Sequence, residues 1–334
     1  MSIYESCTAD RIGIGLWTMQ STAVSPRNLS AVYRDFADDV EYVEQCGFHS
    51  VWTAQHRFWY DGWCPALLHA QAFAAARTRR IRFGNCVLLL AQQDARAFAE
   101  AALTLARLTG GRVDVGVGLG HRDAEFDGLG LSRRTRGRRM DTALETLGQV
   151  WRESCEDGPP QQRAGPPLLI GGMTQAALER AGKHGYGIVM PQSLTSAELR
   201  KRVDSYRSQP RGTGTVVAMR DVWVTSDEQT AAAHRARLDR HYREEAGSWW
   251  VIKDTVGFIP PERLDAQMER IQSCAIVGSA DEVATGLTEL FEAGADLVSI
   301  RTLFDFVDRP EFRAQVARIA NEVLPVLDAA RAQR

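Results

Sequence analysis

Apolar segments of about six residues alternate along the chain with longer stretches whose apolar positions recur at the helical period. Strands of a parallel sheet, buried on both faces and joined by helices, give this alternation. It predicts eight strands, at Arg11–Trp17, Ser50–Ala54, Ile81–Leu90, Arg112–Val117, Pro167–Ile170, Gly187–Pro191, Val216–Thr225 and Asp296–Thr302. Eight strands with eight crossovers predict an α/β fold that closes into a TIM (β/α)8 barrel, as a single domain over residues 1–334.

Helix signals are clearest at three places. The segment Ala95–Leu108 has one apolar face and ends before two glycines. Thr174 can cap a helix over Gln175–His184. Ser279 and Glu282 stand at capping-box spacing, which predicts a helix that begins there and leads into the last strand.

Two segments interrupt the alternation, Glu156–Pro167 and Arg243–Ser279. Long excursions in a barrel usually form loops over the active face. The second one contains the apolar stretches Trp249–Ile252 and Val256–Ile259, with glycines and a Pro-Pro pair that let the backbone hinge and stop. We expect residues 243–279 to form a lid-like insertion that closes over the site, with an ordinary buried crossover as the alternative.

Composition limits the function further. The 334 residues are 44% hydrophobic and 25% charged, as in an ordinary globular enzyme. Lys+Arg 40 against Asp+Glu 42 gives a formal charge of −2, so no global field attracts nucleic acid or anionic lipid. The first residues lack an apolar signal core, and apolar runs are far shorter than the ~20 residues of a membrane span. We expect a soluble cytoplasmic protein with no nucleic-acid or membrane partner.

The cysteines give no sign of a metal site. They are scattered, without a C-x-x-C pair or a cysteine-histidine cluster at zinc spacing: Cys7, Cys46, Cys64, Cys86, Cys155 and Cys274. We expect reduced thiols and no metal. The basic run Arg133–Arg139 indicates the solvated start of a helix rather than a nucleic-acid patch, because the chain as a whole is not basic.

Two strand ends are rich in glycine. Gly116–His121 is not a dinucleotide fingerprint, because His121 or Asp123 stands where a third Gly or Ala is needed. Backbone there can approach a flat group closely, and a tight barrel turn is the alternative. Leu168–Gly172 leads into the helix at Thr174, whose bare amides and hydroxyl suit the phosphate of a cofactor. Many such turns bind nothing, so both interpretations stay open.

Two histidines fall at predicted strand ends, His56 after the second strand and His121 after the fourth. Residues at the carboxyl ends of barrel strands point into the catalytic mouth, and imidazole exchanges protons near neutral pH. We therefore expect His56 to be catalytic, with His121 as second candidate. A structural role is the alternative for a lone histidine.

Several short segments, in order and at fitting distances, combine into one pattern: Gly47–Trp52, Gln55–Phe58, Ile81–Gly84, Gly110–Gly120, Gly137–Asp141, Leu169–Gly172 and Val277–Val283. Together they cover nearly the whole chain. The pattern resembles the bacterial luciferase-like monooxygenases.

The resemblance implies a TIM barrel that takes reduced FMN as co-substrate. The family reacts this flavin with O2 to a flavin C4a-hydroperoxide and oxidises a small, hydrophobic organic substrate, for example in natural-product biosynthesis. Because no NAD(P)H fingerprint is present, a separate NAD(P)H-dependent flavin reductase would supply the reduced FMN. The family also implies a homodimer, for which the apolar helices Pro65–Arg77 and Ala95–Leu108 are candidates.

The resemblance also implies site residues. The family's catalytic histidine lies in an E-H-H-F-like motif, which reads Gln55–Phe58 here, so His56 is retained while the Glu and the second His are replaced. Leu119 stands where the family often has a phosphate-binding Arg, so phosphate binding would depend more on the helix at Thr174. The implied cofactor-binding residues are Asn85, Cys86 and Val87, where a non-prolyl cis bond often occurs, then Gly118, Leu119, Gly120, His121, Gly171, Gly172, Met173 and Thr174.

The expected chemistry needs an apolar site that excludes water. Tryptophans supply much of the apolar bulk, and we expect four of them in the substrate pocket: Trp59, Trp63, Trp249 and Trp250. Trp17 and Trp52 are expected in the core.

Three alternatives remain open at this point. A deazaflavin-dependent oxidoreductase on the same barrel would transfer hydride and ignore oxygen. The altered Gln55 and Leu119 allow a non-catalytic flavin-binding protein, against which the retained His56 argues. A flavin-free barrel such as an aldolase would need a lysine at a strand end, and none stands there convincingly.

Overall fold

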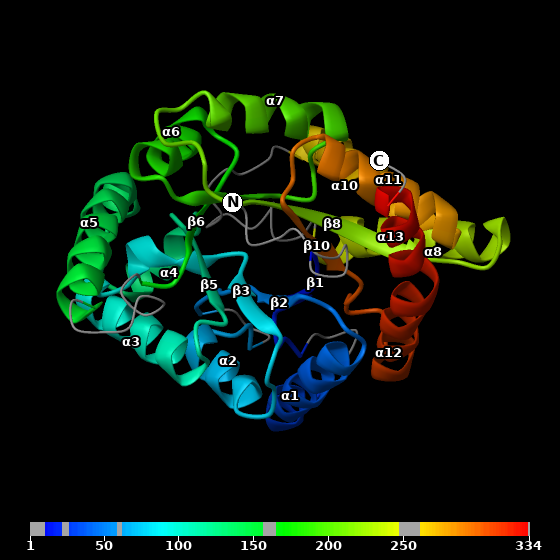
Figure 1. Cartoon of the computed structure of the whole chain (residues 1–334), viewed down its shortest axis with the longest axis horizontal. Helices are drawn as coiled ribbons and strands as arrows, with labels where there is room; N and C mark the ends of the chain where they lie inside the picture. Colours follow the sequence, from blue (N-terminus) through cyan, green and yellow to red (C-terminus); the bar gives the residue numbers. More distant parts are fainter. Residues whose placement is uncertain (1–10, 22–26, 59–61, 156–164, 247–260, 333–334) are drawn as a thin grey trace.

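A computed structural model of the chain describes residues 11–21, 27–58, 62–155, 165–246 and 261–332. Parallel strands form a central barrel that helices surround (Figure 1). The strand order is β10-β1-β2-β3-β5-β6-β7-β8, and β10 also pairs with β8, which closes the ring. The predicted TIM barrel is confirmed.

The eight barrel strands are short and buried, as the apolar segments predict. They are β1 (Ile12–Trp17), β2 (Ser50–Thr53), β3 (Arg82–Asn85), β5 (Val113–Gly118), β6 (Leu168–Gly171), β7 (Gly187–Met190), β8 (Val216–Val224) and β10 (Leu297–Arg301). Apart from β3, each agrees with a predicted strand to within one residue at both ends. The agreement is close because strands buried on both faces read as continuous apolar runs between polar turns.

Two strands differ from the prediction. The segment predicted as Ile81–Leu90 divides into β3 and the short β4 (Leu88–Leu89), which both pair with β5. The Cys86–Val87 peptide bond between them is cis, at the place that the family resemblance implies. The prediction also lacks β9 (Ile276–Gly278), which pairs with the far end of β8. Three residues are too few to show a period.

Helices pack around the barrel. Their bounds are α1 (Leu29–Gln45), α2 (Leu67–Ala75), α3 (Ala95–Leu108), α4 (Asp123–Gly128), α5 (Arg136–Cys155), α6 (Gln175–His184), α7 (Ser196–Arg207), α8 (Glu228–Arg240), α10 (Pro261–Ser273), α11 (Ala280–Glu292), α12 (Arg309–Arg318) and α13 (Leu324–Ala332). Single turns of 3-10 or π-helix add η2 (Leu90–Gln92), η3 (Arg133–Thr135), η5 (His241–Ala246) and η6 (Ile319–Val323). Among the described residues, no helix is long and apolar enough to cross a membrane.

The three clearest helix predictions are confirmed. Helix α3 has the predicted bounds and buries its apolar face. The Thr174 hydroxyl caps α6 by accepting the Ala177 N–H, and Ser279 and Glu282 form the capping box of α11. These caps satisfy amides that a helix start leaves without partners, which explains why local sequence is enough to place them.

The segment Arg243–Ser279, predicted to be a lid-like insertion, forms regular elements in its second half. Residues Pro261–Ser273 form α10, which packs on α8, and β9 then joins the sheet. This half packs on the core, because Ile271 and Cys274 are buried and Ile276 and Val277 of β9 lie partly buried against it. The apolar stretches Trp249–Ile252 and Val256–Ile259, like residues 156–164 of the first excursion, lie outside the described residues.

The barrel interior and the surrounding shell form separate cores. Trp52 lies inside the barrel with apolar side chains of five other positions: Leu169, Val189, Val217, Met219 and Leu297. Cys86 and Val87 lie at the edge of this cluster, half-buried. Trp17 and Trp52 are 3% and 1% exposed, so their predicted place in the core is confirmed.

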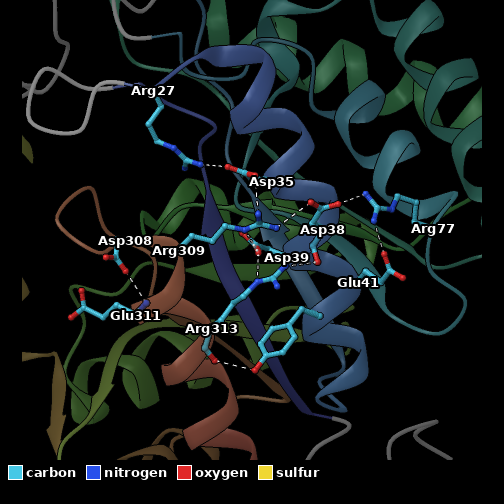
Figure 2. A network of polar contacts seen from close by, with 11 residues as sticks. Arg27, Asp35, Asp38, Asp39, Glu41, Arg77, Asp308, Arg309, Glu311 and Arg313 are labelled. Carbon is cyan, nitrogen blue, oxygen red and sulfur yellow. Dashed lines mark hydrogen bonds and ion pairs between the residues drawn. The ribbon is translucent and has the colours of Figure 1, made fainter.

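An ion-pair network joins the first helix to the region after the last strand (Figure 2). Asp39 of α1 is buried and accepts hydrogen bonds from Arg309 Nε and Arg313 Nε, both at 2.8 Å. Arg77, after α2, binds Asp38 and Glu41 on the same face of α1. The network therefore connects parts of the barrel wall that lie far apart in sequence, next to β1 and β10.

Candidate active site

The carboxyl ends of β2 and β5 bring His56 and Glu125 together. His56 follows β2, and its Nδ1 lies 2.7 Å from Glu125 Oε1. The Glu125 side chain is fully buried, while that of His56 is 14% exposed. Sequence analysis predicted the histidine and missed its partner.

Glu125 is held as a carboxylate by its surroundings. Its Oε1 also accepts the Arg57 backbone N–H at 3.0 Å, and its Oε2 accepts Gln92 Nε2 at 3.0 Å. Burial opposes ionisation, but the hydrogen bond from His56, the charge of His56 and the hydrogen bonds from Arg57 and Gln92 outweigh it and lower the pKa of Glu125. A buried anion at this distance favours the His56 tautomer that has its hydrogen on Nδ1.

Sequence offers little that would single out Glu125. It lies on the short helix α4 between Asp123 and Asp127, and three acidic residues in five are typical of a solvated turn. Only Glu125 turns inward, next to buried Phe126. A signal does exist in its position, because α4 follows the glycine-rich end of β5 and therefore begins at the barrel mouth.

Two rings border His56. Trp63 meets it edge-on at 4.4 Å between ring centroids, and the Trp63 Nε1–H donates to the Ala54 carbonyl at 2.9 Å. His121 meets it at 5.7 Å. Burial, with the nearby charge of His56, lowers the pKa of His121 to about 4. At neutral pH the second candidate histidine is therefore an uncharged neighbour.

Gln55, which replaces the family's Glu, has a structural role. It is buried, its Nε2 donates to the Pro65 carbonyl at 2.5 Å, and its Oε1 accepts the Leu89 N–H at 2.9 Å. These bonds join the end of β2 to β4 and to the loop before α2. The neutral Gln55 amide thus holds β2, β4 and the loop before α2 together next to His56.

The predicted flavin-ring residues lie together around Val87. A Cβ atom at Gly118 would lie 2.5 Å from Val87 Cγ2, and one at Gly171 would lie 2.4 Å from Val87 Cγ1. Both glycines are thus required for packing, whatever else they do. The Val87 side chain packs directly over both glycines, so the ends of β5 and β6 lie close to the segment between β3 and β4.

Asn85, at the end of β3, points away from solvent. It is fully buried, and its Nδ2 donates to Thr53 Oγ1 at 3.3 Å. Its Oδ1 has no hydrogen-bond partner among the described residues. A buried acceptor without a partner is costly, so this atom suits a ligand that carries an N–H group.

The helix start predicted for the phosphate is partly engaged. The Gly172 N–H donates to the Val189 carbonyl at 3.3 Å, and the Thr174 hydroxyl accepts the Ala177 N–H at 3.3 Å. The amides of the first turn of α6 still have no intrahelical acceptors, and Met173 and Thr174 are exposed beside them. The predicted phosphate site is therefore limited to Met173, Thr174 and the amides of that first turn.

Arg136, the first residue of α5, is a candidate that sequence analysis placed in a solvated run. It is half-buried, and burial together with the charge of Arg133 lowers its pKa. Its Nη1 is buried without a hydrogen-bond partner among the described residues, and its charge acts on His121. A guanidinium with unused donors at the barrel mouth fits an anionic group of a cofactor.

Of the predicted substrate-pocket residues, only Trp63 can be placed, because Trp59, Trp249 and Trp250 lie outside the described residues. Trp63 is 6% exposed and lines a pocket of about 210 Å³ beside the ends of β1 and β10. Leu16 lines the same pocket and packs against the cluster around Trp52, as Cys86 and Val87 do. The pocket therefore reaches Trp63, which borders His56, and the same cluster as the predicted flavin-ring residues.

Comparison with known proteins identifies the family. Residues 12–297 match the luciferase-like monooxygenases, and the chain belongs to this family. It is 27% identical to 4-hydroxyprotoasukamycin monooxygenase of Streptomyces nodosus subsp. asukaensis, over 88% of this chain and 86% of that protein. It is 22% identical to the oxygenase component of flavin-dependent trigonelline monooxygenase of Acinetobacter baylyi, over 91% and 92% of the two chains.

Solved structures show the same barrel. The oxygenating constituent of 3,6-diketocamphane monooxygenase of Pseudomonas putida, in complex with FMN, superposes with a TM-score of 0.76 at 16% identity, covering 94% of this chain and 98% of that one. A coenzyme F420-dependent tetrahydromethanopterin reductase of Methanopyrus kandleri gives a TM-score of 0.65 at 17% identity, covering 95% and 99%. At these identities the likeness concerns the fold alone.

Proposed function

We propose that this chain is the oxygenase component of a two-component, FMN-dependent monooxygenase that oxidises a small, apolar organic substrate. The observation that carries the proposal is the pair of His56 and buried Glu125 at the barrel mouth, next to the glycine-lined surface around Val87. The oxygenase names of the trigonelline and diketocamphane relatives support it.

The residues present fit FMN. Cys86, Val87 and the glycines at 118 and 171 would accept the flat ring, and Asn85 Oδ1 would accept an N–H from it. The first turn of α6, with Met173 and Thr174, would hold the phosphate. Leu119 supplies no charge, and Arg136 would take the part of the arginine that the resemblance leads one to expect there.

Reduced FMN, when bound, supplies the electrons that activate O2. His56 would hold a proton at Nδ1 through Glu125 and present a proton-exchanging ring to the reaction space. Trp63 and the apolar interior around Trp52 exclude water from this space. Uncharged His121 adds no competing acid at neutral pH.

The partners follow from this chemistry. Reduced FMN would come from a separate NAD(P)H-dependent reductase, and O2 and a small molecule complete the reaction. We also propose a homodimer through α2 and α3, where Phe73 is 50% and Leu108 75% exposed. Sedimentation at micromolar concentration should show a species of twice 37.0 kDa, and a monomer alone would contradict the dimer.

Anaerobic titration tests the cofactor. The chain should bind reduced FMN more tightly than reduced deazaflavin, and admission of oxygen should then oxidise the bound FMN. Tight binding of reduced deazaflavin with no reaction toward oxygen would favour the hydride-transferring alternative, which the F420-dependent structural neighbour keeps in view. Tight binding of oxidised FMN with no turnover would favour a non-catalytic flavin-binding protein.

A further inference from the structure

The pocket beside Trp63 contains a second polar cluster, which the chemistry above does not use. Its walls are apolar and include Trp17, Phe36 and Phe304. Its charged residues form two groups, one at the rim near α1 and one on the floor at the end of β10. What the pocket can bind depends on which of these charges are available.

The rim charges neutralise one another. Asp35 forms ion pairs with Arg27 and with Arg309 Nη1, the latter at 2.9 Å. Arg309 Nε binds Asp39 at 2.8 Å, and Figure 2 shows these side chains pointing toward one another. The rim therefore has a balanced network in which a ligand would have to replace an existing ion pair.

The floor differs from the rim, because Arg301 lines the pocket there. Arg301 closes β10 with its side chain 15% exposed and its guanidinium 4.5 Å above the Phe304 ring. Its Nη2 donates to His241 Nε2 at 3.0 Å, and His241 Nδ1 lies 2.5 Å from Asp305 Oδ1. Its Nη1 donates to the Tyr242 hydroxyl at 3.4 Å. The arginine is thus held from behind by hydrogen bonds to His241 and Tyr242, with Asp305 in contact with the imidazole.

These contacts also set the protonation of His241. Since Nε2 accepts from Arg301, the ring hydrogen lies on Nδ1 toward Asp305, and the imidazole is uncharged. Burial lowers the pKa of His241 in the same direction, and the charge of Arg301 adds to this, against the effect of Asp305. His241 is therefore a positioning residue for Arg301.

The charges around Arg301 decide which ligand it suits. A guanidinium only donates hydrogen bonds, so the ligand must offer an acceptor. Asp221 Oδ1 lies buried 4.0 Å from Arg301 Nη1, and Asp305 is the carboxylate that lines the pocket beside Arg301. Two carboxylates against one arginine oppose a further anion, while the guanidinium opposes a cation. The ligand that fits these charges is a neutral molecule with an oxygen acceptor on an apolar body.

We propose that Arg301, positioned by His241 and Asp305, binds the carbonyl oxygen of a neutral, carbonyl-bearing substrate whose apolar part lies against Trp17, Trp63 and Phe304. This assignment rests on the proposed function, since it places the substrate of that reaction beside His56. It names Arg301 as the residue that selects the substrate class.

Three probes with one body and different charge test the proposal: acetophenone, benzoate and benzylammonium. Their binding to the full chain is measured by ligand-observed NMR without flavin, so that a failure here leaves the FMN and oxygen experiments untouched. Acetophenone should bind most tightly, by about threefold or more. Tighter binding of benzoate, or of benzylammonium, would overturn the proposal, as would equal binding of all three.

Variants sharpen the test. Arg301→Met should weaken acetophenone binding roughly fivefold or more, the worth of one buried hydrogen bond, while Arg96→Met on the exposed face of α3 should change it less than about twofold. Arg301→Lys keeps the charge without the planar fork and serves if the Met variant fails to fold. Unchanged acetophenone binding in a folded Arg301 variant would contradict the assignment.

Discussion

Two histidine-carboxylate pairs lie at the mouth of this barrel, and they differ in what surrounds the imidazole. His56 pairs through Nδ1 with fully buried Glu125 and keeps 14% of its side chain exposed. His241 pairs through Nδ1 with Asp305, is 4% exposed, and has its Nε2 bound by Arg301. We propose that the first pair serves proton exchange and that the second is a fixed support for Arg301.

The difference lies in the carboxylate as much as in the histidine. Glu125 accepts hydrogen bonds from His56, the Arg57 amide and Gln92, and Arg122 Nη1 lies 3.7 Å from its Oε1, so several donors stabilise its negative charge. Beside His241, Arg301 supplies a fixed positive charge that opposes protonation of the ring. The other neighbours of a histidine-carboxylate pair therefore decide whether it suggests acid-base chemistry or a structural role.

The largest expected effect distinguishes the His56–Glu125 pair from the His241–Asp305 pair. Glu125→Gln removes the anion that pairs with His56 Nδ1, and we expect hydrogen peroxide release from protein-bound reduced FMN and O2 to become roughly a hundredfold faster. Asp305→Asn, the matched change in the other pair, should alter that release less than about threefold. Stopped-flow mixing with a peroxidase assay measures both, and similar effects of the two changes would refute the distinction.

A second test concerns Arg136, whose charge acts on His121. Arg136→Met should weaken FMN binding roughly tenfold, because the guanidinium has an unused buried donor at the mouth. Riboflavin, which lacks the phosphate, should bind equally well before and after the change. Arg138→Met, at an exposed position of the same helix, is the control. Equal losses for FMN and riboflavin would show that Arg136 acts on the fold instead.

The glycine-lined surface gives a stability test. Gly118→Ala would place a methyl group 2.5 Å from Val87, which cannot move away because Gly171 lies on its other side. We expect thermal and urea unfolding to show a loss of roughly 2–3 kcal/mol. The double variant with Val87→Ala should recover most of it. A Gly118→Ala protein as stable as the parent would mean that the strand ends can separate.

The smallest effect concerns acid. Burial lowers the pKa of His234 to about 3, where it stacks on Trp223 at 4.1 Å. Below pH 6.5 the unfolded chain binds a proton that the folded one refuses, so the free energy of unfolding falls as pH drops. At pH 5 this costs about 2 kcal/mol relative to pH 7. His234→Phe keeps the stacking and should remove that part of the loss, as urea titrations at the two pH values would reveal.

Sequence predicted the barrel well because its signals are local. Strands buried on both faces appear as apolar runs, and Thr174 and Ser279 cap helices within three residues of themselves. The place of His56 after a strand predicts that it lies at the carboxyl end of the barrel, where the structure has it. The family resemblance pointed to Val87 and its neighbours.

The partners of these residues could not be predicted. Glu125 lies 69 positions from His56, and nothing in its own neighbourhood separates it from exposed Asp127. Arg301 and His241 are 60 positions apart and meet only because β8 and β10 close the ring. Which charged side chain is buried depends on barrel closure, and that is a property of the whole fold.

The central claim is that His56 and Glu125 act as one unit on the reaction of reduced flavin with oxygen. A double-mutant cycle of His56→Ala and Glu125→Gln, read as the rate of hydrogen peroxide release at equal FMN occupancy, tests it most directly. We predict that the double variant releases peroxide no faster than His56→Ala alone. If the two changes instead multiply the rate of peroxide release independently in the double variant, the account is contradicted.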